Sequence, residues 1–105
     1  MQVDKIFEQM PGRYIKGKAT KKTVYYFSIG DFRCTVTLEP EGVTVEPGKK
    51  VGDADVVLKT TPELFEKMVL KGKMPGPIDI ARGKVKTNDP VGLKGLRDYF
   101  DFSGL

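Results

Sequence analysis

Hydrophobic and polar residues change their spacing along the chain, and each spacing predicts a different secondary structure. Near the start, apolar residues recur three or four positions apart, which predicts a short amphipathic helix that Pro11 and Gly12 end. From residue 23, β-branched and aromatic residues form runs typical of strands, and in some of these runs polar and apolar residues alternate, as expected for one buried and one solvated face. The predicted strands cover residues 23–29, 32–38, 43–45, 54–59 and 83–87.

The strand predicted at 32–38 shows the alternation most clearly. Gly30 and Asp31 precede it and predict a hairpin turn that joins it to the strand before it. One side of the strand is predicted to face the core, with Phe32, Cys34, Val36 and Leu38. The other side is predicted to face water, with Arg33, Thr35 and Thr37.

A helical spacing returns after residue 60. Thr61 is a suitable N-cap, Pro62 suits the first helical position, and Gly72 is a natural C-terminal stop. Residues 78–81 fit either a loop or one helical turn. A last helix is predicted to begin with Asp89 as its cap and to extend to residue 100 along one apolar side.

The order of these elements predicts an α+β fold in which helices cover one face of the sheet. At 105 residues, the chain has the length of one domain, so we expect residues 1–105 to form a single unit. No apolar stretch approaches the ~20 residues of a membrane span, and the charged start lacks the apolar core of a secretory signal. These features predict a cytoplasmic protein.

The residues needed for common catalytic sites are scarce. The chain has no histidine, and its single cysteine, Cys34, falls on the predicted apolar side of a strand. One cysteine is too few for zinc, and neither of the usual glycine-rich phosphate loops is present. We therefore expect no catalytic residue, no metal and no cofactor.

Positive charge is concentrated at the start of the chain. The net charge is +4, and residues 1–22 hold six basic side chains against two acidic ones. Such a segment could contact an anionic membrane surface or could be simply solvated. The basic residues considered for membrane contact are Arg13, Lys16, Lys18, Lys21 and Lys22. Only Tyr14 lies among them for base stacking, so nucleic acid is not expected as a partner.

Several short motifs occur in an order that resembles the sterol carrier protein 2 family. Residues 54–65 read Ala-Asp, a strand, then Thr-Pro-Glu-Leu-Phe, and they are followed by Gly72-Lys73, Gly83-Lys84-Val85-Lys86 and Gly92-Leu93. The resemblance implies a five-stranded mixed, mostly antiparallel sheet with three or more helices on one face. It also implies an apolar tunnel for fatty acyl chains, sterols or similar lipids.

Carried over by position, the resemblance implies a set of ligand-binding residues on two helices and at a tunnel mouth. These are Phe65, Met68, Val69, Leu93, Leu96 and Phe100 along the tunnel, and Met74, Ile78 and Ile80 at the mouth or roof. The chain departs from the family pattern at Asp79, at Ile80, at residues 75–77 and at Asp89-Pro90. These departures lie near the expected entrance, so they leave the ligand undefined.

Two functions follow from these observations. The first is non-enzymatic binding, and transfer or presentation, of a hydrophobic ligand. The second is an accessory module with a filled core that serves a lipid- or quinone-modifying complex. Periodicity does not distinguish a filled core from a hollow one, and the oligomeric state and pathway stay open.

Overall fold

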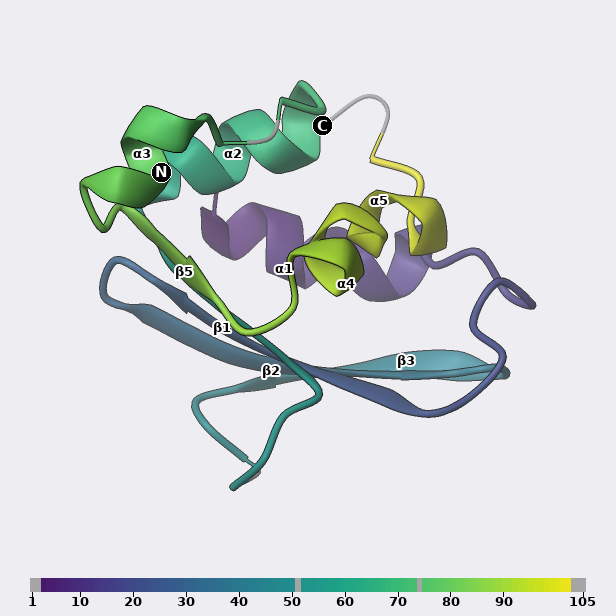
Figure 1. Cartoon of the computed structure of the whole chain (residues 1–105). Coiled ribbons are helices and arrows are strands. Elements are labelled where there is room, and N and C mark those ends of the chain that lie inside the picture. The colour runs from purple at the N-terminus through teal and green to yellow at the C-terminus, as the bar shows by residue number, and fades with distance from the viewer. Residues whose placement is uncertain (1–2, 51, 74, 103–105) are drawn as a thin grey trace.

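The computed structural model describes residues 3–50, 52–73 and 75–102, and within them five strands form one sheet (Figure 1). The elements in chain order are α1 Val3–Arg13, β1 Thr23–Ile29, β2 Phe32–Glu39, β3 Gly42–Pro47, β4 Val56–Thr60, α2 Pro62–Leu70, α3 Pro77–Ala81, β5 Val85–Thr87, α4 Pro90–Lys94 and α5 Leu96–Tyr99.

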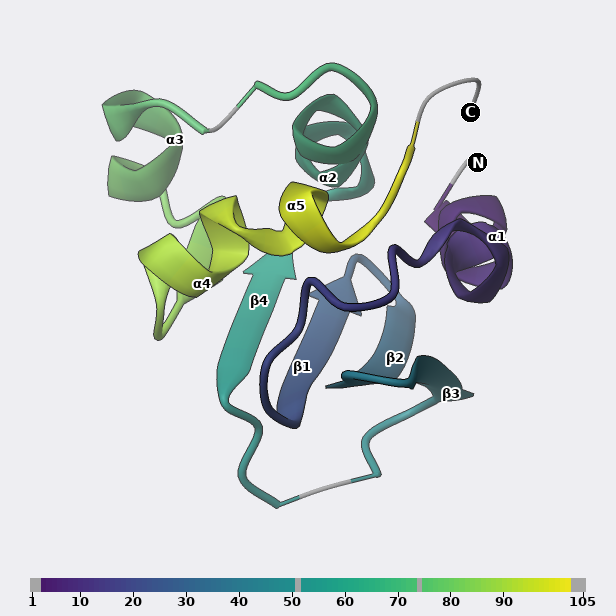
Figure 2. The ribbon, with the colours of Figure 1, turned by 90° about the vertical axis from the view of Figure 1, so that its right-hand side faces the viewer.

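The sheet is mixed and mostly antiparallel, as predicted. Its strand order is β3-β2-β1-β4-β5, and only β1 and β4 pair in parallel. The helices all lie on one face of the sheet, which is seen from the side in Figures 1 and 2. The α+β class and the position of the helices are therefore confirmed.

The core lies between that face of the sheet and the helices. Cys34, Val36 and Leu38 of β2 lie in it, as the sequence pattern predicted, together with residues of β1. Three rings join α1, the sheet and α2: the ring centre of Phe7 lies 5.1 Å from that of Phe27 and 5.2 Å from that of Phe65. Each fully buried side chain of this kind contributes about 1.5–3 kcal/mol to folding, so this cluster holds the helices on the sheet.

The helix boundaries around residue 61 agree with the sequence signals. The Thr61 side chain accepts a hydrogen bond from the Leu64 main-chain N–H (3.3 Å), and Pro62 begins α2. Gly72 follows the helix with a φ of +66°, a conformation that favours glycine. Residues 78–81, which fitted a loop or a turn, lie within α3.

Helix α1 does not end at Pro11 and Gly12, so this prediction is wrong. The helix continues to Arg13. Pro11 lacks a helical N–H donor and its ring crowds the preceding turn, but it lies in the last turn of the helix, and the chain keeps helical geometry for two more residues. The buried side of the helix, with Val3, Ile6, Phe7 and Met10, is as predicted.

The last helix is divided, where one continuous helix to residue 100 was predicted. Gly95 ends α4 and begins α5, and Phe100 has an extended backbone that pairs with Tyr14. Main-chain hydrogen bonds from Ile15 to Tyr99 (2.8 Å) and from Asp101 to Arg13 (2.9 Å) fix this region. Main-chain groups near the end of α5 therefore form hydrogen bonds with the chain at the end of α1 instead of continuing a helix.

Thr35 was predicted to face water but is only 1% exposed. The connection from β3 to β4 packs over it on the outer face of the sheet. The Thr35 hydroxyl donates to the carbonyl oxygen of Gly48 (2.8 Å) and accepts from the N–H of Lys50 (3.0 Å). Both hydrogen-bonding functions of the hydroxyl are thus satisfied in the buried position.

Candidate ligand-binding site

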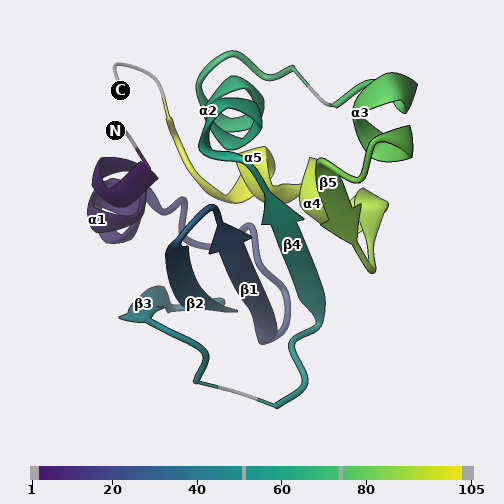
Figure 3. The same ribbon diagram turned by 90° about the vertical axis from the view of Figure 1, so that its left-hand side faces the viewer.

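An apolar groove of about 640 Å³ lies between α3, β5 and α4. Figure 3 shows these three elements side by side at one end of the sheet. The residues that line the groove are Pro75, Ile80, Val85, Lys86, Thr87, Pro90, Val91, Leu93 and Lys94. The walls are thus aliphatic and proline side chains together with two lysines and a threonine.

The α4 wall of the groove is fixed by three contacts around Gly92. The Asp89 carboxylate accepts a hydrogen bond from the Gly92 N–H (2.9 Å), which caps the helix. The Tyr25 hydroxyl donates to the Gly92 carbonyl oxygen (2.8 Å) from the central strand. A Cβ atom at Gly92 would lie 2.8 Å from the Val56 side chain, so glycine permits this close approach of α4 to β4.

Strand β5 supplies the floor, and side-chain hydrogen bonds at both of its ends join it to β4 and to the residue before β4. The Thr60 hydroxyl donates to the Lys84 carbonyl oxygen (2.8 Å) just before β5. After β5, the Asn88 side chain accepts from the Val57 N–H (2.7 Å) and donates to the Asp55 carbonyl oxygen (3.3 Å). The buried Val85 side chain is thereby set between α3 and α4.

Large aliphatic side chains are left in contact with water on both sides of the groove. Ile80 on α3 is 59% exposed, and Val91 on α4 is 81% exposed. Lys86 and Lys94 are exposed and lie in the same lining. The groove therefore combines uncovered apolar surface with positive charge, which suits an amphiphile with an anionic head.

The predicted ligand-binding residues that the structure describes lie in three different places. Ile80 and Leu93 line the groove, and Ile78 is 67% exposed on α3 outside the groove lining. Met74 lies outside the described residues. The other predicted residues are buried in the core: Phe65, Met68, Val69, Leu96 and Phe100.

Sequence reasoning missed most of the groove lining, including Val85, Val91, Lys86 and Lys94. Val91 carried a signal that could have been noticed. It is an apolar residue on the side of the last helix that the pattern assigned to solvent. The lysines carried none, because a lysine in a groove and a lysine on an open surface have the same local sequence pattern.

A second cavity, of about 750 Å³, lies at the end of α1. Its lining includes Glu8, Arg13 and Asp101 together with Tyr14 and Ile15. This mixture of charges is unsuited to an apolar chain, because burying charged groups against hydrocarbon is costly. The groove beside β5 is therefore the better candidate for a hydrophobic ligand.

Cys34 is held in a form that is poorly reactive. It is 1% exposed, and burial raises the pKa of its thiol to about 11. The nucleophilic thiolate is thus disfavoured at neutral pH. Among residues 3–50, 52–73 and 75–102, no group of three or more histidine, cysteine or acidic residues is placed to hold a metal ion.

None of the helices in the described part of the chain has the length and apolar character that crossing a bilayer requires.

Neither the protein-family models nor the curated protein sequences give a match to this chain. Among solved structures, it is similar to a double mutant of the sec-alkyl sulfatase PisA1, with a TM-score of 0.74 and 22% identity. That likeness covers 96% of this chain and 16% of the sulfatase chain. The stereoselective inverting sec-alkylsulfatase Pisa1 from Pseudomonas sp. gives a TM-score of 0.71 and 22% identity, over 97% of this chain and 17% of that chain.

The chain is also similar to UbiJ-SCP2, a ubiquinone synthesis protein, with a TM-score of 0.50 and 15% identity. This likeness covers 70% of this chain and 64% of that chain. The chain spans only 16–17% of the length of the two sulfatases. At these identities the likenesses show the fold alone, and the likeness to UbiJ-SCP2 supports, for the fold, the resemblance to sterol carrier protein 2 seen in the sequence.

Proposed function

We propose that this chain binds one hydrophobic ligand, without catalysis, in the groove between α3, β5 and α4. The observation that carries the proposal is the aliphatic lining around Leu93, Ile80 and Val85, in a groove of about 640 Å³. Small-molecule sites commonly measure about 300–1,000 Å³ and combine apolar walls with a few polar groups. The groove has both properties.

The two lysines of the lining favour an amphiphile with an anionic head, such as a fatty acid. Its alkyl chain would lie against Leu93 and Val85, and its carboxylate would face Lys86 and Lys94. Exposed ion pairs contribute about 0–1 kcal/mol, whereas each buried CH₂ contributes about 0.8 kcal/mol. The alkyl chain would therefore supply most of the affinity, and the lysines would select the head group.

The buried residues implied by the family resemblance would take part only after a rearrangement. Leu96 and Phe100 pack in the core together with Phe65, Met68 and Val69. A ligand would reach them only if α4 and α5 moved away from α2 and the sheet. Binding in the groove requires no such motion, so we place the ligand there.

The fold likenesses are compatible with this proposal. The names of the similar structures refer to a sec-alkylsulfatase and to ubiquinone synthesis. For this chain, the shared feature is the fold, and the proposed ligand follows from the groove.

The direct test is titration of the delipidated protein with a fluorescent fatty acid. We expect saturable binding of one probe per chain and displacement by unlabelled fatty acid. Native mass spectrometry of the freshly purified protein should also reveal a bound lipid. If fatty acids, sterols and quinones all fail to bind saturably, the proposal is wrong.

A second candidate function is that of an accessory module with a filled core. It is favoured by one observation: a fold that covers 96% of this chain recurs as a small part of a much longer sulfatase chain. A ligand that binds the folded state raises the melting temperature, whereas a filled module does not respond. Thermal unfolding with and without fatty acid therefore distinguishes the two functions.

A further inference from the structure

Exposed aliphatic side chains occur on both α3 and α4, and two of them, Ile80 and Val91, line the same groove. In the described part of the chain, four large hydrophobic side chains are exposed, and three of them are Ile78, Ile80 and Val91. The fourth, Ile15, is far less exposed, at 36%. Large apolar groups left in water close together commonly mark a contact surface.

The same part of the chain is strongly basic. Residues 71–94 carry six basic side chains and two acidic ones, and all six basic residues are exposed: Lys71, Lys73, Arg82, Lys84, Lys86 and Lys94. Both acidic side chains accept hydrogen bonds within their own helices. Asp79 accepts from the Gly76 N–H (3.3 Å) and Asp89 from the Gly92 N–H (2.9 Å).

The cations nearest the groove are not neutralised by ion pairs. Arg82 directly follows α3, Lys84 directly precedes β5, and Lys86 and Lys94 line the groove. Within the residues that the structure describes, none of these four has an acidic side chain within ion-pair distance. Their charge is therefore available to an anionic partner.

We propose that the face made by Ile78, Ile80, Val91 and these four cations, termed here the α3–α4 face, docks on an anionic lipid bilayer. Aliphatic side chains that enter the interface, together with surrounding cations that meet anionic head groups, are the two elements of peripheral membrane binding. The groove opens on this face, so a docked molecule would hold it against the bilayer. This inference rests on the proposed function, because docking matters here as the way in which a lipid ligand reaches the groove.

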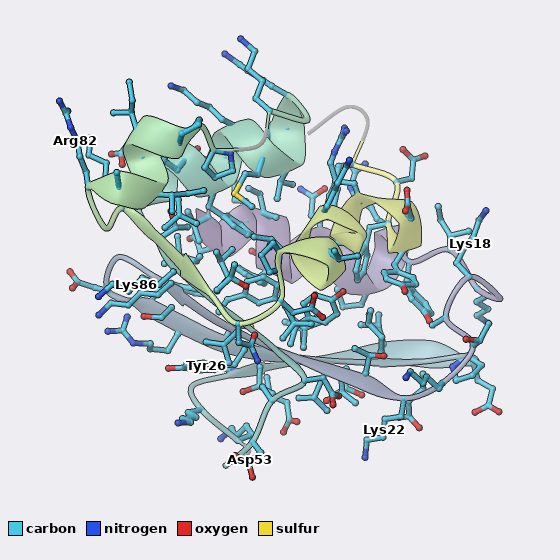
Figure 4. The ribbon with its side chains drawn as sticks, viewed as in Figure 1. Lys18, Lys22, Tyr26, Asp53, Arg82 and Lys86 are labelled. Atoms are coloured by element: carbon cyan, nitrogen blue, oxygen red, sulfur yellow. The ribbon has the colours of Figure 1, made fainter. Side chains whose placement is uncertain are left out.

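The basic N-terminal segment offers a competing surface, and membrane contact through it was expected from the sequence. Figure 4 shows Lys18 and Lys22 at one side of the molecule and Arg82 and Lys86 at the other. The N-terminal segment adds only Ile15 to its cations. The α3–α4 face combines charge with three exposed aliphatic residues and is therefore the better fit to a bilayer.

Nucleic acid fits the α3–α4 face less well than a bilayer does. Proteins that bind single strands place aromatic side chains among their cations so that bases can stack. The exposed hydrophobic residues here are isoleucine and valine. Aliphatic residues suit the acyl boundary of a membrane and offer no stacking platform.

The test is co-sedimentation of the full chain with vesicles of phosphatidylcholine and phosphatidylglycerol, compared with vesicles of phosphatidylcholine alone. We expect association with the anionic vesicles that weakens as salt is raised. The double variant Arg82→Gln, Lys84→Gln should lose about fivefold in association for each cation removed. Neither residue lines the groove, so binding of a soluble fluorescent fatty acid should be unchanged.

Two further variants test the face without changing the groove lining. Ile78→Ser should weaken association with vesicles and leave fatty-acid binding intact, since Ile78 is exposed and lies outside the lining. Lys18→Gln, Lys22→Gln makes the same change of charge at the other side of the molecule and should have little effect.

The outcomes separate docking from ligand binding. If the soluble fatty acid binds but anionic vesicles do not, the docking surface is wrong and the proposed function stands. If Lys18→Gln, Lys22→Gln reduces association as much as Arg82→Gln, Lys84→Gln, the N-terminal segment is the contact and the inference is overturned. Tight, salt-sensitive binding of an oligonucleotide that Ile78→Ser does not change would overturn it in favour of nucleic acid.

Discussion

The hydroxyl of Tyr25 donates a 2.8 Å hydrogen bond to the main-chain carbonyl oxygen of Gly92, which joins the central strand β1 to helix α4. Burial, followed by the nearby Tyr99 and Asp89, raises the pKa of the Tyr25 hydroxyl. The hydroxyl therefore stays protonated and continues to donate well above neutral pH. Through this bond, the position of one groove wall depends on a residue of the core.

Tyr25→Phe should lower the free energy of unfolding by about 1 kcal/mol, because it removes the donor and leaves the Gly92 carbonyl without this partner. Denaturant titration measures the loss, and the fatty-acid probe should bind more weakly because the α4 wall is loosened. Tyr26→Phe is the matched control. Its ring lies on the outer face of the sheet, 5.5 Å from Lys49 Nζ, and this contact survives the change. An equal loss for both variants would contradict the role of the Tyr25 bond.

Gly92→Ala should destabilise the protein by about 1–3 kcal/mol, the usual cost of overpacking. Its Cβ would lie 2.7 Å from the capping carboxylate of Asp89 and 2.8 Å from the Val56 side chain, so one of them must shift. Gly95→Ala, three residues later, is the matched control. The added Cβ atom would lie 3.6 Å from the nearest main-chain oxygens, and Gly95 has a φ of −72°, which alanine adopts readily. This variant should be neutral or slightly stabilising. Thermal unfolding of the two variants tests the close approach of α4 to β4.

Leu96→Trp tests whether the family-like tunnel residues form a cavity or a packed core. Leu96 is buried with Phe100 and Phe65, so we expect the larger ring to cost about 1–3 kcal/mol. Urea titration gives this value. A nearly unchanged stability, combined with loss of fatty-acid binding, would show that the ligand occupies the interior and that the groove assignment is wrong.

Features that depend on neighbours in the sequence could be predicted. The turn at Gly30, the cap at Thr61 and the stop at Gly72 each follow from the properties of a few adjacent residues. The alternation in β2 also identified the residues of that strand that face the core. These local signals were sufficient for the fold class.

Features that depend on distant segments could not be predicted. The end of the last helix at Tyr99 coincides with main-chain bonds between the Tyr14 region and residues 99–101, more than eighty residues apart. Likewise, the sequence pattern of α3 does not tell which isoleucine faces α4, and the structure places Ile80 in the groove and Ile78 outside it. Thr35 is buried only because a loop from β3 folds over it.

The buried thiol of Cys34 should make stability depend on pH in the alkaline range. Burial raises its pKa from 9.0 to about 11. Above pH 9 the unfolded chain releases this proton while the folded chain retains it, so stability falls as pH rises. The stability of the parent relative to Cys34→Ala should fall by about 2–3 kcal/mol between pH 9 and pH 11. Comparing the two proteins at each pH cancels the titration of lysines and tyrosines, and a constant difference would contradict the prediction.

Ile80→Asp and Ile78→Asp test the central claim most directly, because both residues are exposed on α3 and only Ile80 lines the groove. The measurement is the affinity of the delipidated protein for a fluorescent fatty acid, with thermal unfolding to confirm that both variants are folded. Ile80→Asp places a charge where the alkyl chain would lie and should weaken binding by at least about tenfold. Ile78→Asp should bind as the parent does. Binding that is unchanged in Ile80→Asp, or equally weakened in both folded variants, would contradict a ligand site between α3, β5 and α4.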